Sequence, residues 1–151
     1  MKDWIHKYFS EDDLITIKNE VNRIEKSTSG EIILSFRNKR SLIEKLYKYH
    51  ELAMKDFEKL KVWNTKKRTG ILVFIVFEEK YFDIIADEGI FPKIPDETWN
   101  RLEEKLKAEF RSGNYLNGMM HLISEMGDVL VSEFPVSPDD VNELPDDIVL
   151  N

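Results

Sequence analysis

The chain has 151 residues, of which 42% are hydrophobic and 34% are charged, as in an ordinary globular domain. It contains no cysteine, which excludes a disulfide framework, a zinc site built on thiolates and a cysteine nucleophile. The formal net charge of −7 argues against a nucleic-acid partner, because neutralising phosphates requires a basic surface.

The first helix is expected to begin after Ser10, a residue type that commonly caps helix N-termini. Its apolar positions recur every three or four residues and form one buried stripe: Leu14, Ile17, Val21 and Ile24. The β-branched run over residues 31–36 follows as the first strand.

A second helix is expected to begin at Ser41, because apolar residues again recur at helical spacing. These positions are Leu42, Leu46, Tyr49, Ala53, Phe57 and Leu60. Residues 70–77 are apolar throughout, as in a central strand that is covered on both faces. The charged turn at residues 78–80 then leads into a third strand over residues 81–86, so these two strands form an antiparallel hairpin.

Asp96 is the expected N-cap of a third helix, and a fourth helix covers residues 116–134. From Pro135 onward the sequence is acidic and rich in proline. We therefore expect one domain over residues 1–135 and a mobile acidic tail over residues 136–151.

The order helix, strand, helix, strand, strand, helix, helix indicates a layered α/β fold with about four helices. The first two strands should be parallel, because a helix crosses between them, and the third should run antiparallel to the second. The central sheet is therefore expected to be small and mixed.

The N-terminal residues lack the apolar segment and cleavage site of a secretory signal, and the run 71–77 is too short to cross a bilayer. We therefore expect a cytoplasmic protein with no direct membrane insertion.

Standard catalytic motifs are missing from the sequence. The six glycines show no phosphate-loop or dinucleotide spacing, and no serine lies in a nucleophile elbow. The three histidines lie in separate segments without metal-ligand spacing: His6, His50 and His121.

The expected topology brings polar residues to one edge of the sheet. The first two strands start there and the third ends there, so Glu31, Arg68, Asp87 and Glu88 should meet, and Asp96 could fold back over them. Clustered carboxylate oxygens suit a hard divalent cation, Ca²⁺ or Mg²⁺. The alternative is structural: Asp96 is only a helix cap and Glu31 only pairs with Arg68.

These segments, in this order, resemble the TPM domain family, which includes thylakoid-lumen photosystem II repair proteins and bacterial membrane-anchored relatives. The main matching segments are Thr28-Ser29-Gly30-Glu31-Ile32, Ala53 with Phe57, residues 65–68 before 70–73, Asp87-Glu88-Gly89-Ile90, residues 94–96, and Phe110-Arg111-Ser112-Gly113-Asn114-Tyr115 with Gly118. The resemblance implies a three-layer αβα sandwich and a divalent-cation site in the loops at one sheet edge. Acid phosphatase activity has been attributed to some relatives.

Two features depart from the family pattern. The sequence lacks the signal peptide and the membrane anchor, and it carries Glu88 where relatives often have a small or uncharged residue. We therefore do not expect a lumenal role, and we expect the residues that bind the cation to differ from those of the relatives.

The leading hypothesis is a cytoplasmic module for binding or assembly that holds a divalent cation through Asp87, Glu88 and Asp96. Glu31 would orient Arg68 or a bound water, and the partner would be a protein, for example a membrane-anchored paralogue. The alternative is a metal-assisted phosphatase for phosphate monoesters, in which Arg68 contacts the phosphate and Asp87 or Asp96 transfers the proton. A third hypothesis is an adaptor that docks partners through the acidic tail.

Overall fold

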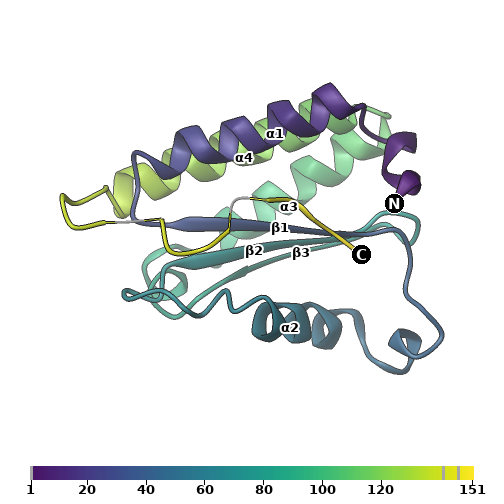
Figure 1. Cartoon of the computed structure of the whole chain (residues 1–151), viewed down its shortest axis with the longest axis horizontal. Helices are drawn as coiled ribbons and strands as arrows, with labels where there is room; N and C mark the ends of the chain where they lie inside the picture. Colours follow the sequence, from purple (N-terminus) through teal and green to yellow (C-terminus); the bar gives the residue numbers. More distant parts are fainter. Residues whose placement is uncertain (1, 141, 146) are drawn as a thin grey trace.

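The structure is a computed structural model that describes residues 2–140, 142–145 and 147–151. Three helices (α1, α3 and α4) cover one face of a central sheet, and α2 covers the other face (Figure 1). The three-layer αβα sandwich expected from the sequence is therefore confirmed. The elements are η1 (Asp3–Lys7), α1 (Glu11–Glu25), β1 (Glu31–Arg37), η2 (Glu44–Leu46), α2 (Tyr49–Lys59), β2 (Gly70–Val76), β3 (Tyr81–Ala86), η3 (Phe91–Lys93), α3 (Asp96–Arg111), α4 (Tyr115–Glu133) and β4 (Val149–Leu150).

The sheet has the strand order β3-β2-β1-β4. β1 pairs in parallel with β2, with Glu31 opposite Gly70, and β3 pairs antiparallel with β2, with Tyr81 opposite Val76. Both pairings agree with the expected mixed sheet. β4 was not predicted, because two residues in an acidic, proline-rich segment carry no recognisable strand pattern.

The core lies on both sides of the sheet, and β1 and β2 are buried along their whole length. Side chains alternate between the two faces: Ile71 and Val73 pack toward the three-helix layer, whereas Leu72 and Phe74 pack toward α2. This two-sided burial explains why the sequence of β2 is apolar throughout.

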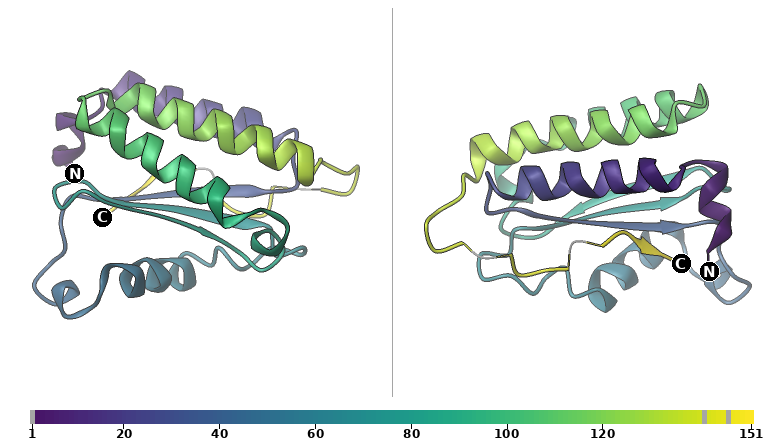
Figure 2. Two further views of the ribbon diagram at one scale, coloured as in Figure 1. Left: turned by 180° about the vertical axis from the view of Figure 1, so that it is seen from behind. Right: turned by 45° about the horizontal axis from the view of Figure 1, so that its top comes forward.

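The N-terminal boundary expected for the second helix is wrong. Ser41 and Glu44 bond reciprocally through side chain and backbone (2.8 and 3.2 Å), which closes a single turn, and Glu44 also pairs with Arg37 at 3.1 Å. The helix itself begins only at Tyr49. Leu42 and Leu46 are therefore 85% and 82% exposed, in a loop that extends beyond the end of the sheet (Figures 1 and 2).

The other helix starts lie within one residue of the sequence expectation. Ser10 caps α1, because its side chain accepts the Asp13 N–H and the Asp13 carboxylate accepts the Ser10 N–H, both at 3.0 Å. The expectation that Asp96 caps α3 is wrong by one position. Pro95 occupies the N-cap, and Asp96 is the first helical residue, because a proline with extended ψ ends the preceding loop.

After α4 the chain folds back along the sheet (Figure 2, right). Thr28 and Pro135 form an isolated bridge, Leu144 is buried in the cluster under α2, and the Asn151 N–H donates to the Phe36 carbonyl at 2.9 Å. In the described part of the chain, no helix is long and apolar enough to cross a membrane.

Candidate functional site

Three segments meet at the sheet edge where β1 and β2 begin and β3 ends. The Glu31 N–H donates to the Thr69 carbonyl at 3.0 Å, and the Asp87 N–H donates to the Gly70 carbonyl at 2.9 Å. The Thr69 hydroxyl donates to the Ser29 carbonyl at 2.9 Å. These bonds hold the three chain segments in fixed positions relative to one another, so their side chains share one surface.

Asp87 is the central carboxylate of this edge and is only 5% exposed. Arg68 grips it with two bonds, Nε to Oδ2 at 2.7 Å and Nη2 to Oδ1 at 2.9 Å. Oδ1 also accepts the Glu88 N–H at 2.8 Å. The hydrogen bonds to Asp87 raise the pKa of Arg68 above its usual value, so the guanidinium is charged at neutral pH.

Arg68 has a left-handed backbone conformation, with φ of 55°. Its carbonyl accepts the Gly89 N–H at 2.8 Å. A Cβ added at Gly89 would lie 2.2 Å from the Lys67 carbonyl oxygen and 2.5 Å from that of Arg68. Only glycine fits this contact, and a left-handed non-glycine residue stores strain of the kind that gathers at functional sites.

The remaining acidic residues of the predicted site differ in how they are held. Glu88 is exposed and pairs with Arg68 Nη1 at 3.2 Å. Asp96 is exposed at the start of α3, and within the described ranges its side chain forms no hydrogen bond or ion pair. The structure therefore brings Arg68, Asp87 and Glu88 together, whereas the Asp96 side chain forms no hydrogen bond or ion pair with them.

Glu31 has a partner that the sequence did not suggest. Its side chain is buried, and Oε1 accepts the N–H groups of Glu143 and Leu144, both at 2.7 Å. The expected pairing with Arg68 is not formed, because Arg68 binds Asp87 and Glu88 instead. Glu31 thus fastens the C-terminal segment to the start of β1.

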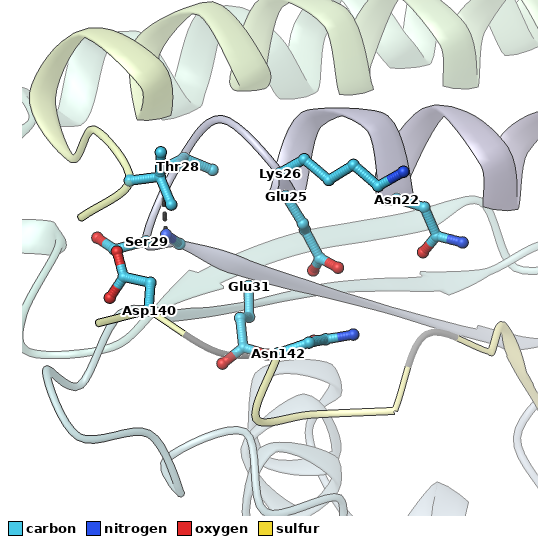
Figure 3. A pocket seen from close by; sticks show the side chains of 10 residues that line it. Asn22, Glu25, Lys26, Thr28, Ser29, Glu31, Asp140 and Asn142 are labelled. Carbon is cyan, nitrogen blue, oxygen red and sulfur yellow. Dashed lines mark hydrogen bonds between the residues drawn. The ribbon is translucent and has the colours of Figure 1, made fainter. Parts of the chain in front are cut away.

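A pocket of about 390 Å³ lies beside Glu31, between the end of α1, the start of β1 and the C-terminal segment (Figure 3). Figure 3 shows the Glu25 and Glu31 side chains above and below the start of β1, with Asp140 and Asn142 beside them. Glu25 Oε2 accepts the Ile32 N–H at 2.7 Å. Oxygen atoms from three separate segments therefore line one hollow.

Glu25, Asp140 and Asn142 were missed from the sequence. Asp140 Oδ2 accepts the Ser137 N–H at 2.6 Å, and its Oδ1 lies 3.5 Å from Lys67 Nζ. The Ser137 N–H, together with Lys67, holds the pKa of Asp140 below its usual value. The Ser137-x-x-Asp140 spacing is typical of a capped turn and was an available signal for local order.

The carboxylates of this edge are spread rather than gathered. Among the described residues, no three histidine, aspartate or glutamate side chains are grouped so that they could hold a metal ion by themselves. A cation at this edge would need backbone carbonyls, hydroxyls and water to complete its coordination, which Ca²⁺ and Mg²⁺ both accept.

Comparisons with known proteins give a consistent result. A family model described as the TPM domain matches residues 6–129. The NMR structure of the BA42 protein from the psychrophilic bacterium Bizionia argentinensis superimposes with a TM-score of 0.85 and 30% identity, covering 95% of this chain and 96% of that one. The N-terminal domain of the cg2496 protein from Corynebacterium glutamicum shares the fold, with a TM-score of 0.62, 10% identity and coverage of 89% and 81%. No curated protein sequence matches the chain.

Proposed function

The chain belongs to the TPM domain family, as its sequence predicted, and from this premise we propose that it is a binding or assembly module with a divalent-cation site. The site lies at the strand-start edge, the end of the sheet where β1 and β2 begin and β3 ends. The supporting observation is the buried carboxylate of Asp87, whose positive partner Arg68 has a side chain that is 40% exposed. A buried carboxylate needs a compensating positive charge. A partly exposed arginine side chain can change its rotamer and leave the carboxylate oxygens to a cation.

In this proposal Arg68 and the cation compete for the same oxygens. Asp87 and Glu88 give the direct contacts to Ca²⁺ or Mg²⁺, and Asp96 contributes through water from the adjoining start of α3. Glu31 serves the site indirectly, because it holds the C-terminal segment beside the pocket. Cation binding would free the Arg68 guanidinium for a partner, which gives the module a binding surface that depends on the cation.

The phosphatase alternative has weaker support from the geometry. Three of the five N–H groups of Arg68 donate to Asp87 or Glu88, so a phosphate would have to use the two that remain or displace a carboxylate. Of the two candidates for proton transfer, Asp96 shares no hydrogen bond with Arg68 or Asp87. Both carboxylate oxygens of Asp87 already accept hydrogen bonds from Arg68, so neither residue is free and positioned to transfer a proton.

The test is an amide NMR titration of metal-free protein with Ca²⁺ and Mg²⁺. We expect shifts at residues 28–31, 68–70 and 86–97 that disappear in Asp87→Asn. Arg68→Gln should bind the cation more tightly than the wild type, because the competitor is gone. Lys66→Gln is the matched control: it removes an exposed positive charge two residues away, so its affinity should stay close to that of the wild type.

Each result has a defined meaning. No shifts with either cation, or weaker binding by folded Arg68→Gln, would rule out the competition. An equal increase in cation affinity in Lys66→Gln would show that the increase in Arg68→Gln comes from the loss of a positive charge and not from the loss of a competitor for Asp87. Hydrolysis of p-nitrophenyl phosphate that is lost in both Asp87→Asn and Asp96→Asn, with dispersed NMR spectra retained, would support the phosphatase instead.

A further inference from the structure

A second pocket lies at the opposite end of the sheet from the strand-start edge. It has a volume of about 470 Å³ and lies where β2 ends and turns into β3, against the end of α3 and the start of α4. Ligands of open α/β sheets usually bind beyond the carboxyl ends of the strands, and this pocket occupies that position for β2.

The wall of the pocket is aromatic and comes from four segments of the chain. Phe110 is central, with ring centroids 5.3 Å from Phe82, 5.1 Å from Tyr115 and 5.7 Å from Phe77. Tyr8 closes the other side, 4.7 Å from Phe77 and 4.9 Å from Tyr115. Because each ring packs against others, the wall is formed before any ligand arrives.

The rim of the pocket is basic, although the chain as a whole carries a net charge of −7. Lys80, Lys107 and Arg111 line it, against a single carboxylate, Glu78. Within the described residues, Lys80 and Arg111 form no ion pair, whereas Lys107 lies 3.5 Å from Glu104 and also interacts electrostatically with Glu103. The charges of Lys80 and Arg111 are therefore available to a ligand.

We propose that this pocket binds a small aromatic anion, with its ring against Phe82, Phe110 and Tyr115 and its acidic group at Arg111 and Lys80. An aromatic cage alone would equally suit a cation held over the ring faces. The three positive side chains at the rim exclude that choice, because they repel a cation and attract a carboxylate. The volume is that of a typical small-molecule site.

The probe for the test is 2-naphthoate, added to the full chain and followed by amide and aromatic NMR. We expect saturable shifts at residues 77–82 and 107–115, and intermolecular NOEs from the naphthalene ring to Phe82 and Tyr115. The neutral analogue 2-naphthamide should bind about tenfold more weakly, because it lacks the charge-assisted contact.

Two variants on α3 separate a specific contact from general electrostatics. Arg111→Gln should weaken 2-naphthoate binding about tenfold. Arg101→Gln makes the same charge change at an exposed position of the same helix outside the pocket lining, and should leave the affinity unchanged. The proposal is overturned if the neutral 2-naphthamide, or decanoate as an anion without an aromatic ring, binds as tightly as 2-naphthoate. It is also overturned if the chemical shift changes fall outside the pocket, or if Arg111→Gln and Arg101→Gln change the affinity equally.

Discussion

Two glycines next to functional segments are required for different reasons. Gly89 lies in contact with the backbone carbonyls of Lys67 and Arg68, so a side chain at this position would clash with them. Gly113 follows α3 with φ of 79° and has open space where a Cβ would point. Glycine is therefore favoured at position 113 only by its backbone conformation, the left-handed turn that ends a helix.

Alanine at the two positions should consequently have unequal effects. Gly89→Ala forces the carbonyls of residues 67 and 68 to move, and we expect a loss of about 3 kcal/mol in the free energy of unfolding. Gly113→Ala meets no neighbour and should cost about 1 kcal/mol, the penalty of a left-handed alanine. Urea denaturation of both variants measures the difference. Equal losses would show that the close approach at Gly89 relaxes freely.

The sequence could identify most of the polar residues at the strand-start edge, although not their partners. The strand order alone places Arg68, Asp87 and Glu88 together, because parallel and antiparallel pairing fix which strand ends coincide. The partner of Glu31 could not be predicted, since it lies 112 residues away in a segment whose composition suggests mobility. Long-range contacts of this kind leave no periodic pattern in the sequence.

At the scale of elements, the segment before α2 shows where periodicity misleads. Leu42 and Leu46 continue the apolar spacing of α2, yet the turn closed by Ser41 and Glu44 directs the chain away from the sheet. The hydrophobic pattern records which side chains would share a helical face, but a local hydrogen-bonded turn decides whether that helix forms. The remaining helices and three of the four strands were predictable, because no such competing turn interrupts them.

Substitutions on the two sides of this boundary should separate the exposed leucines from the core. Leu46→Gln alters a side chain that is already in water, so the free energy of unfolding should change by less than about 0.5 kcal/mol. Leu52→Ala removes a buried side chain of α2 that packs on the sheet, and should cost about 3 kcal/mol. Thermal and urea unfolding test both. A large loss in Leu46→Gln would mean that this segment packs against the body in solution.

At the scale of the whole molecule, the two ends of the sheet carry different chemical groups. The strand-start edge carries Glu31, Asp87 and Glu88, with the C-terminal segment folded against it. The far end carries an aromatic pocket with a basic rim. Because β1 and β2 are buried along their whole length, the sheet holds these two ends at a fixed distance from each other.

The described residues of the C-terminal segment are part of this arrangement through contacts with several elements. Glu31 accepts two of its backbone N–H groups, Leu144 enters the core under α2, and β4 adds a short strand beside β1. Burial of Leu144, the Glu31 bonds and the packing of Ile148, Val149 and Leu150 against the core therefore hold the segment together, with β4 too short to hold it alone.

A double-mutant cycle tests whether Glu31 and the C-terminal segment stabilise each other. Deletion of residues 142–151 should cost about 3 kcal/mol, because a leucine is lost from the core and two hydrogen bonds to a buried carboxylate disappear. Glu31→Gln should cost about 1 kcal/mol in the full chain. In the shortened chain the same change should cost almost nothing, because the two N–H groups that the Glu31 carboxylate binds have been removed. Urea unfolding of the four proteins gives the coupling free energy, expected to exceed about 1 kcal/mol. Additive effects would mean that the segment is held independently of Glu31, and an unchanged stability on deletion would mean that it is a mobile tail.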